Sequence, residues 1–210
     1  MKTKEVAASG ATCCCASIVF LLSLIGLLGI WWDDTYSVGD WDIKFTADLK
    51  EIELEITANG QTVSTKTEWD DECKGDGASS DDNCDKKDMV GFMMILAIIV
   101  LLLTLIFIVV LIILQCQGTG AICQKVSWGG ACGGFVFAFI FALGAVGQGS
   151  LEIEQTDEVI EMGGSAFIST VLMIVLLLLT CIPHLAGAFF MYKSGGSGGQ
   201  VVYVDQSQNQ

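Results

Sequence analysis

The sequence contains no arginine, only one proline and one histidine, and few charged residues of any kind. Only 16% of its 210 residues are charged, whereas a soluble domain normally has about a quarter. All ten basic residues are Lys, and 24 acidic residues bring the net charge to −14. The shortage of clustered basic residues argues against nucleic acid as a partner. A hydrophobic content of 52% and a mean hydropathy of +0.61 indicate a membrane protein instead.

Long uncharged runs account for this hydropathy. Residues 89–114 include 20 Ile, Leu, Val or Phe side chains and no charge. At roughly 0.3–0.6 kcal/mol each, these favour membrane insertion by about 6–12 kcal/mol. We expect four transmembrane helices, over residues 12–32, 89–114, 127–147 and 164–192. Aromatic residues at the ends of these runs are expected at the membrane interface; they are Trp31, Trp32, Trp128 and Tyr192.

The first run raises the alternative of a cleaved secretory signal, because Lys2 and Lys4 precede it. It ends in Trp-Trp-Asp-Asp, however, without a small-x-small cleavage site. We therefore interpret it as a retained helix.

The lysines predict which segments face the cytosol. Segment 1–11, loop 115–126 and tail 193–210 contain four Lys and two acidic residues, so they and both termini are placed inside, with the tail disordered. The large loop 33–88 and the short loop 148–163 are then extracellular. The large loop has 17 acidic residues and six Lys, and the short one has five acidic residues and no base. Because six Lys run against the charge rule, the cysteines provide a separate test.

Cys73 and Cys84 are the two cysteines of the loop placed outside the cell, and two is the number that one disulfide requires. Closing a loop of about ten residues stabilises a fold by about 2–3 kcal/mol. A metal site is the alternative, but two Cys without His fall short of four ligands.

The remaining cysteines lie in or beside the predicted helices. Five of them are candidates for S-palmitoylation at the cytosolic helix ends, or simply small residues suited to a membrane boundary; they are Cys13, Cys14, Cys15, Cys116 and Cys123. Cys132 and Cys181 are interpreted as packing residues.

The large loop is predicted to form strands. Apolar residues alternate over 43–49 and, in shifted phase, over 52–56, so a bulge or tight turn is expected near 48–51. Asn-Gly at 59–60 predicts a two-residue hairpin, with the return strand over 61–68. The apolar face of this sheet should cover the outer helix ends. The short loop alternates from Leu151 and is expected to add a strand, and the polar stretch after Cys73 is expected to form a mobile tip.

This arrangement resembles the claudin-like superfamily of tetraspan proteins. Trp69-Asp-Asp-Glu-Cys73 followed by Cys84 is similar to its signature of a Trp before two bonded cysteines, and Trp32 takes the place of the Trp after the first span. The usual Gly-Leu before the signature Trp is Thr-Glu here. The resemblance implies an all-α membrane four-helix bundle with a small extracellular antiparallel β-sheet.

A few residues inside the spans invite separate interpretation. His184 follows Pro183 in the fourth span and is expected to be neutral and bonded to the carbonyl that the proline leaves free, with a functional role as the alternative. Two Gly-x-x-x-Gly pairs begin the third span and predict close helix packing, within the bundle or between copies. These are Gly129 with Gly133, and Gly130 with Gly134.

No catalytic constellation appears in the sequence, so we expect neither an enzyme nor a cofactor. We expect a structural, adhesive or membrane-organising protein of the plasma membrane, whose partners are the bilayer and itself or another membrane protein. An auxiliary subunit or chaperone of an ion channel or receptor is the alternative. The acidic loop should attract cations diffusely rather than bind Ca²⁺ at a specific site.

Overall fold

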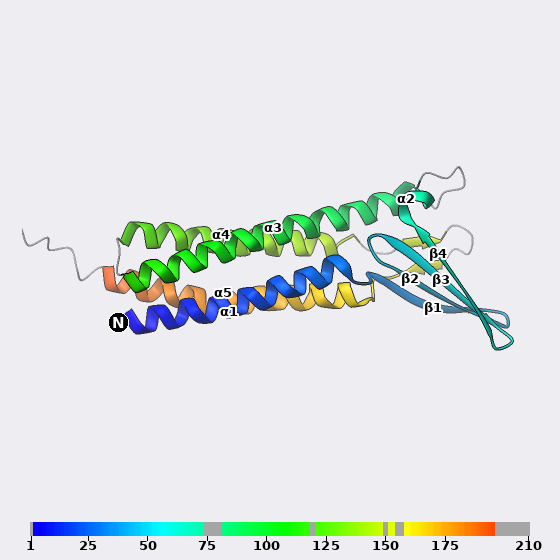
Figure 1. Ribbon diagram of the computed structural model, residues 1–210, viewed down its shortest axis with the longest axis horizontal. Coiled ribbons are helices and arrows are strands. Elements are labelled where there is room, and N and C mark those ends of the chain that lie inside the picture. Colours follow the sequence, from blue (N-terminus) through cyan, green and yellow to red (C-terminus); the bar gives the residue numbers. More distant parts are fainter. Residues whose placement is uncertain (1, 74–80, 118–120, 149–150, 154–157, 196–210) are drawn as a thin grey trace, which may run out of the picture.

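The computed structural model describes residues 2–73, 81–117, 121–148, 151–153 and 158–195. Residues 74–80 of the predicted tip and most of the predicted tail lie outside these residues. The expectation that the tip continues to Asp88 is wrong, because residues 81–88 are the first turns of α3. Four long helices lie side by side, and a sheet lies at one end of them (Figure 1). Their bounds are Lys2–Leu28 for α1, Asp81–Gln117 for α3, Ala121–Val146 for α4 and Ser165–Gly195 for α5. A fifth helix, α2, is the short turn Trp69–Glu72 before α3.

All four long helices are apolar enough to cross a membrane, as the sequence predicts. Each begins or ends away from the predicted span boundaries, because a helix does not have to stop where its apolar run stops. The segment 2–11, expected to precede the first span, is the beginning of α1. We call the end of the bundle beside the sheet the sheet end, and the end where α1 begins and α5 ends the terminal end (Figure 1).

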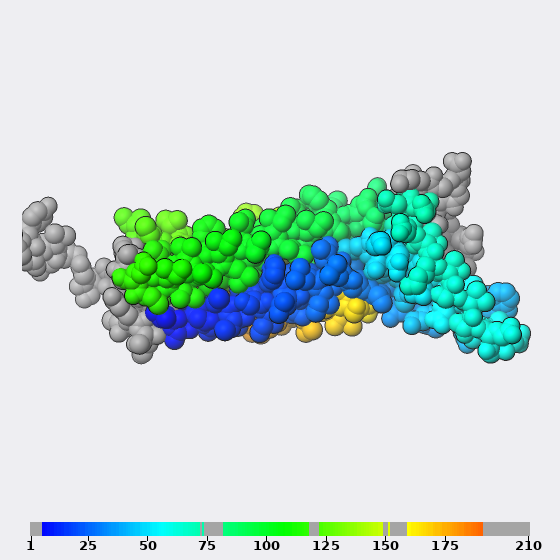
Figure 2. Space-filling view, viewed as in Figure 1, coloured from blue at the N-terminus to red at the C-terminus, as the bar shows by residue number. Residues whose placement is uncertain are grey.

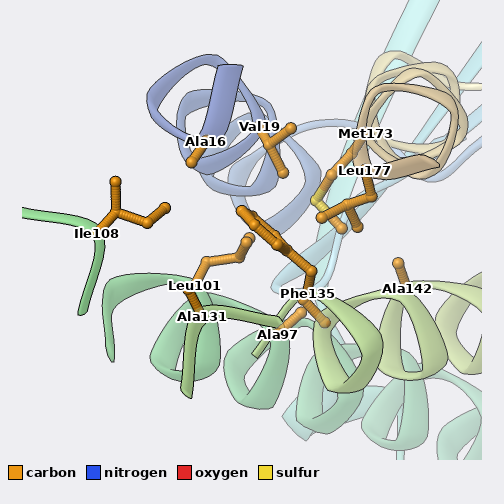
Figure 3. Packing of buried hydrophobic residues seen from close by; sticks show 11 residues of the cluster. Ala16, Val19, Ala97, Leu101, Ile108, Ala131, Phe135, Ala142, Met173 and Leu177 are labelled. Carbon is orange, nitrogen blue, oxygen red and sulfur yellow. The ribbon is translucent and has the colours of Figure 1, made fainter. Parts of the chain in front are cut away.

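The bundle packs around Phe135 of α4, which is 2% exposed. Its ring points between side chains of the other three long helices, among them Val19, Leu101 and Leu177 (Figure 3). Small residues let the helices approach on either side of this ring; they are Ala16, Ala97, Ala131, Ala138 and Ala142. The outer faces of the same helices are rich in exposed Ile, Leu, Val and Phe side chains, such as Leu21, Ile106, Phe137 and Leu178. That distribution suits an apolar surrounding rather than water.

The sheet is an antiparallel meander with the strand order β1-β2-β3-β4. Its strands are Trp32–Val38 for β1, Trp41–Ala47 for β2, Glu51–Ala58 for β3 and Gln61–Glu68 for β4. The predicted hairpin is confirmed, with positive φ angles of 51° at Asn59 and 74° at Gly60. The predicted turn between β2 and β3 is confirmed too. The Asp48 carboxylate accepts hydrogen bonds there from the backbone N–H groups of Lys50 (2.6 Å) and Glu51 (2.7 Å).

Two further strands, β5 (Leu151–Ile153) and β6 (Glu158–Ile160), pair with each other. The sequence predicts a strand at Leu151, and the structure confirms it. The expectation that it extends the main sheet is wrong, since β5 and β6 form a separate two-stranded sheet. A single β-bridge between Trp32 and Met162 links this segment to β1.

Candidate functional site

Three tryptophans lie where the main sheet meets the helix ends. Trp31 and Trp32 are fully buried and Trp69 is 2% exposed. The ring centroids of Trp31 and Trp32 are 6.4 Å apart, and those of Trp32 and Trp69 are 6.2 Å apart, edge to face. The expectation that Trp31 and Trp32 face the membrane interface is therefore wrong. The sheet and the helix ends cover both rings, and they form a core of their own.

Hydrogen bonds to backbone carbonyls fasten this junction to two helices. The indole N–H of Trp31 donates to the carbonyl of Gly26 in α1 at 2.7 Å. At the start of α5, the N–H of Ala166 donates to the Ile30 carbonyl at 2.7 Å. The backbone N–H of Trp31 donates to the Ala47 carbonyl of β2 at 2.9 Å. The sheet is thus an extension of α1 and α5 rather than a domain on a linker.

The sheet is attached to a third long helix, α3, through α2 and a disulfide. Trp69 begins α2, and its indole N–H donates to the Asp48 carbonyl in the β2–β3 turn at 2.8 Å. Cys73 and Cys84 form the predicted disulfide, which joins the end of α2 to the first turn of α3. Leu49 of the same turn packs beside Gly91 of α3, 3.8 Å from where a Cβ would lie. Trp32 and Trp69, which the family resemblance singles out, therefore meet in one cluster.

The pairing register gives the main sheet two contrasting faces, because residues directly opposite each other on antiparallel strands share a face. One face has Asp33, Thr46, Glu53 and Lys66 in one row and Thr35, Lys44, Glu55 and Ser64 in the next. We call it the polar face. A third row, at the hairpin ends, is Ser37, Asp42, Thr57 and Thr62.

The opposite face is mainly apolar, although Asp34, Thr65 and Thr67 lie on it near the helices. Near the helices its apolar residues are buried or half-buried in the hydrophobic core around the three tryptophans; they are Trp32, Phe45, Ala47, Ile52 and Leu54. Farther out, the face continues with apolar residues that are exposed or half-buried. We call these the distal patch, which comprises Tyr36, Val38, Trp41, Ile43, Ile56 and Val63.

Lys66 is the centre of an ion-pair cluster on the polar face. Its ammonium group lies 3.2 Å from a carboxylate oxygen of Glu51 and 3.2 Å from one of Glu53. The hydroxyl of Ser64 donates to Glu53 at 2.9 Å, and this bond together with Lys66 lowers the pKa of Glu53. The two carboxylates in turn raise the pKa of Lys66 through hydrogen bonds and charge. The cluster neutralises part of a face that is otherwise rich in acid.

Metal binding finds no support in the part of the chain that the structure describes. No group of three or more His, Cys, Asp or Glu side chains there lies close enough to hold an ion. Two of the nearby lysines instead pair with acids at the start of α3: Lys86 with Asp82 and Lys87 with Asp88, each at 2.7 Å. The diffuse attraction of cations stays a prediction.

The five lipidation candidates occupy different levels of the bundle. Cys116 and Cys123 are exposed at the terminal end, in the last turn of α3 and the first turn of α4. Cys14 is exposed as well, but it lies 12 residues after Lys2 in α1, about 18 Å along the helix at 1.5 Å per residue. Cys13 and Cys15 flank it and are half-buried. Lipidation stays a prediction for all five.

The two glycine pairs face different surroundings. A Cβ on Gly130 would meet the ring of Phe107, and one on Gly134 would collide with Thr104, both in α3. This pair packs within the bundle, which is one of the two predicted roles. Among the residues that the structure describes, nothing lies within 4 Å of a Cβ on Gly129 or Gly133, so this side of α4 is open there.

His184 bonds to α4 and not to the carbonyl that Pro183 frees, so that prediction is wrong. Its Nε2 lies 3.2 Å from the Trp128 carbonyl oxygen, and the Trp128 indole N–H donates to the His184 carbonyl at 3.1 Å. A carbonyl oxygen only accepts, which places the imidazole proton on Nε2. The two rings stack with centroids 4.6 Å apart. Trp128 therefore packs against α5 from a position two turns inside α4, and its place at the membrane interface stays a prediction.

Sequence reasoning missed β1 and with it the distal patch. Tyr36 and Val38 alternate on one side of a two-residue turn, and Trp41 and Ile43 on the other. Gly39, with a φ of 65°, supplies the positive φ that the turn needs. These two signals together could have predicted the first hairpin.

No family model matches this sequence, and no curated protein matches it. The claudin-like resemblance therefore stays a prediction.

Proposed function

We propose that this protein is a claudin-like, four-pass protein of the plasma membrane with a structural, adhesive or membrane-organising role. Its four long helices cross the bilayer, both termini lie in the cytosol, and the main sheet stands outside the cell. In this orientation the Cys73–Cys84 disulfide lies in oxidising space, where such bonds form and persist.

One observation carries the adhesive role, namely the fastening of the main sheet to three of the four long helices. Buried tryptophans, backbone hydrogen bonds and the disulfide join it to α1, α3 and α5. A sheet held in this way keeps its faces in a fixed direction, so a partner that binds it loses less conformational freedom. Such rigidity suits a protein whose outer part contacts neighbours in the same or the opposing membrane.

The charge of the outer segment adds a second property. Between Asp33 and Asp88, 17 acidic residues outnumber six Lys. A field of one sign concentrates counterions whatever the detailed geometry, so cations gather in any narrow space between such molecules.

Topology and adhesion are tested in one cell line. Epitope tags at each terminus should be detected only after permeabilisation, and reduced Cys73 and Cys84 should react with an impermeant maleimide on intact cells. Cells that express the protein should then aggregate more than cells that express a version with Trp69→Ala. Surface-accessible tags would contradict the topology, and equal aggregation would contradict the adhesive role.

The open side of α4 favours a second candidate, an auxiliary subunit of another membrane protein. Gly129 and Gly133 allow a helix of a partner to approach closely there. Intact complexes extracted in mild detergent distinguish the two candidates by mass. A homo-oligomer supports adhesion, whereas a fixed ratio to an unrelated channel or receptor, lost on Gly133→Leu, supports the auxiliary role.

A further inference from the structure

The distal patch is a continuous apolar surface at the end of the sheet farthest from the bundle. The register places Tyr36, Ile43, Ile56 and Val63 in one row across all four strands. Val38 and Trp41 begin the next row, beside Ala58 and Gln61. Figure 1 shows both hairpin turns well beyond the helix ends, and Figure 2 shows this part of the sheet as a lobe that projects from the molecule.

The outermost side chains of the patch are open to solvent. Val38 is 54% exposed, Trp41 53% and Val63 66%. A large exposed aromatic residue among aliphatic ones is typical of the centre of a binding surface. Leaving this surface in water costs free energy, which is why contiguous patches of this kind mark interaction sites.

Charge selects the kind of partner. The two rows of the patch contain no charged residue within the described sheet, whereas the polar face has acidic residues in each of its three rows. A basic partner would therefore choose the polar face. Two copies of this acidic chain repel each other over most of their outer surface, and these two uncharged rows are where they can touch without placing like charges together.

Area restricts the partner further. Four strands about 4.8 Å apart and four residues at about 3.4 Å each give a footprint of about 260 Å². A stable complex of soluble proteins buries about 800 Å² on each partner, so the patch alone would hold a freely diffusing protein only weakly. Partners that are both fixed in membranes meet at a high effective concentration and do not need so large a contact.

We propose that the distal patch binds the distal patch of a second copy of this chain. The contact is isologous, since the same surface is used on both molecules and an apolar sheet face complements itself. The two sheets pack face to face, about 10 Å apart, with Trp41 and Val63 of each copy against the other. This inference rests on the adhesive function proposed above and names its partner.

The experiment uses the full chain reconstituted in lipid vesicles. Val63→Asp and Thr62→Asp are a matched pair, because they add the same charge at neighbouring exposed positions of β4 on opposite faces. Val63→Asp should reduce self-association by about tenfold or more, since it brings two carboxylates together in the contact, while Thr62→Asp should change it less than twofold. Self-association is measured by energy transfer between labelled copies, either in one vesicle population or between two populations. The first arrangement detects contacts in one membrane, and the second detects contacts between opposing membranes.

A second pair of variants guards against misfolding of Val63→Asp. Val63→Cys copies should become cross-linked by a short impermeant bismaleimide, and Thr62→Cys copies should not. Equal effects of the paired variants in both assays, while the parent protein still self-associates, would overturn the patch contact and leave adhesion standing. If the parent protein self-associates in neither arrangement, the patch contact and the adhesive function both fail.

Discussion

The indole N–H of Trp69 donates a hydrogen bond of 2.8 Å to the backbone carbonyl of Asp48, 21 residues earlier in the chain. The backbone N–H of Trp69 also donates to the Lys50 carbonyl at 3.1 Å, so α2 is bonded twice to the β2–β3 turn. Because Cys73 ends α2 and is bonded to α3, this turn is fastened to the bundle through one short helix. These contacts hold the β2–β3 turn to α3, in addition to the attachment of the sheet to α1 and α5.

Replacing Trp69 tests that dependence. Trp69→Phe keeps an aromatic ring but loses the donor, and should lower the free energy of unfolding by about 1 kcal/mol for the lost hydrogen bond. Trp69→Ala also leaves a cavity and should cost about 3–5 kcal/mol. Thermal unfolding in detergent, followed by circular dichroism, measures both. Trp41→Phe, at a residue 53% exposed, is the control and should change little. Equal stabilities of all three variants would contradict the anchoring role of Trp69.

The disulfide should stabilise the same region. It closes a sequence separation of 11 residues, which in the chain-entropy estimate corresponds to about 2–3 kcal/mol. The double variant Cys73→Ser with Cys84→Ser should therefore have a lower unfolding temperature than the parent protein. Reduction of the parent protein should lower its unfolding temperature by a similar amount. Cys14→Ser removes an exposed free thiol and should leave unfolding unchanged. If reduction has no effect on the parent protein, the disulfide does not support the fold.

Neighbouring glycines of α4 should respond in opposite ways to the same substitution. Gly134→Ala forces a methyl group onto Thr104 of α3, and overpacking of this kind costs about 1–3 kcal/mol. Gly133→Ala meets no atom within 4 Å and should be neutral or stabilise α4 slightly, by at most about 1 kcal/mol. Unfolding of both variants in detergent makes the comparison. A destabilising Gly133→Ala would show that the open side of α4 is occupied, for example by a second chain.

The sequence predicts the elements whose signals are local. The four long helices follow from uninterrupted apolar runs, and three strands follow from alternation and the Asn59–Gly60 turn. Strand β1 escapes prediction because Asp34 occupies an apolar-face position, opposite Phe45, and interrupts the alternation. The alternation of Tyr36 and Val38 before the Gly39 turn is the local signal that remains, and the pairing with β2 shows that Trp32 shares their face.

Side-chain partners depend on how the helices rotate, and the sequence does not determine this. Both glycine pairs have the same spacing, yet only Gly130 and Gly134 turn toward α3. Trp31 and Trp32 end an apolar run as interface residues do, but the sheet folds back over them and buries both. The local context of His184 suggests a bond within its own helix, whereas the bundle provides Trp128 from another helix instead.

The polar face should show a measurable pH dependence. The hydrogen bond from Ser64, followed by that from Lys66, holds the pKa of Glu53 below its ordinary value of 4.5. A lowered carboxyl pKa stabilises the fold above pH 4.5, and this contribution is lost as the pH falls through the lowered value. Lys66, with its pKa raised above 10.5, stabilises the fold below that pH and loses the effect as the pH rises through its own value.

Removing the strongest of these contacts gives a direct test. Ser64→Ala should move the pKa of Glu53 up toward 4.5, as followed by NMR titration of the side-chain carboxyl carbon. Ser37→Ala removes a hydroxyl that donates instead to Asp42, at 2.7 Å, and should leave the pKa of Glu53 where it was. A pKa of Glu53 that Ser64→Ala does not change would assign the lowering to Lys66 alone.

Residues His184 and Trp128 should be energetically coupled, because each donates a hydrogen bond to the backbone of the other. His184→Phe keeps a ring that can stack on Trp128 but loses the Nε2 donor, and Trp128→Phe loses the indole donor. If the pair acts as a unit that holds α4 to α5, the double variant should be less destabilised than the two single variants added together. The coupling expected for contacting residues is about 0.5–3 kcal/mol, measured by unfolding in detergent.

Thr12→Val is a matched control, since that hydroxyl bonds within its own helix to the Ala8 carbonyl, and its effect should simply add to that of His184→Phe. Additive effects of His184→Phe and Trp128→Phe would mean that the stacked rings do not hold the two helices together, and that the central packing around Phe135 does so instead.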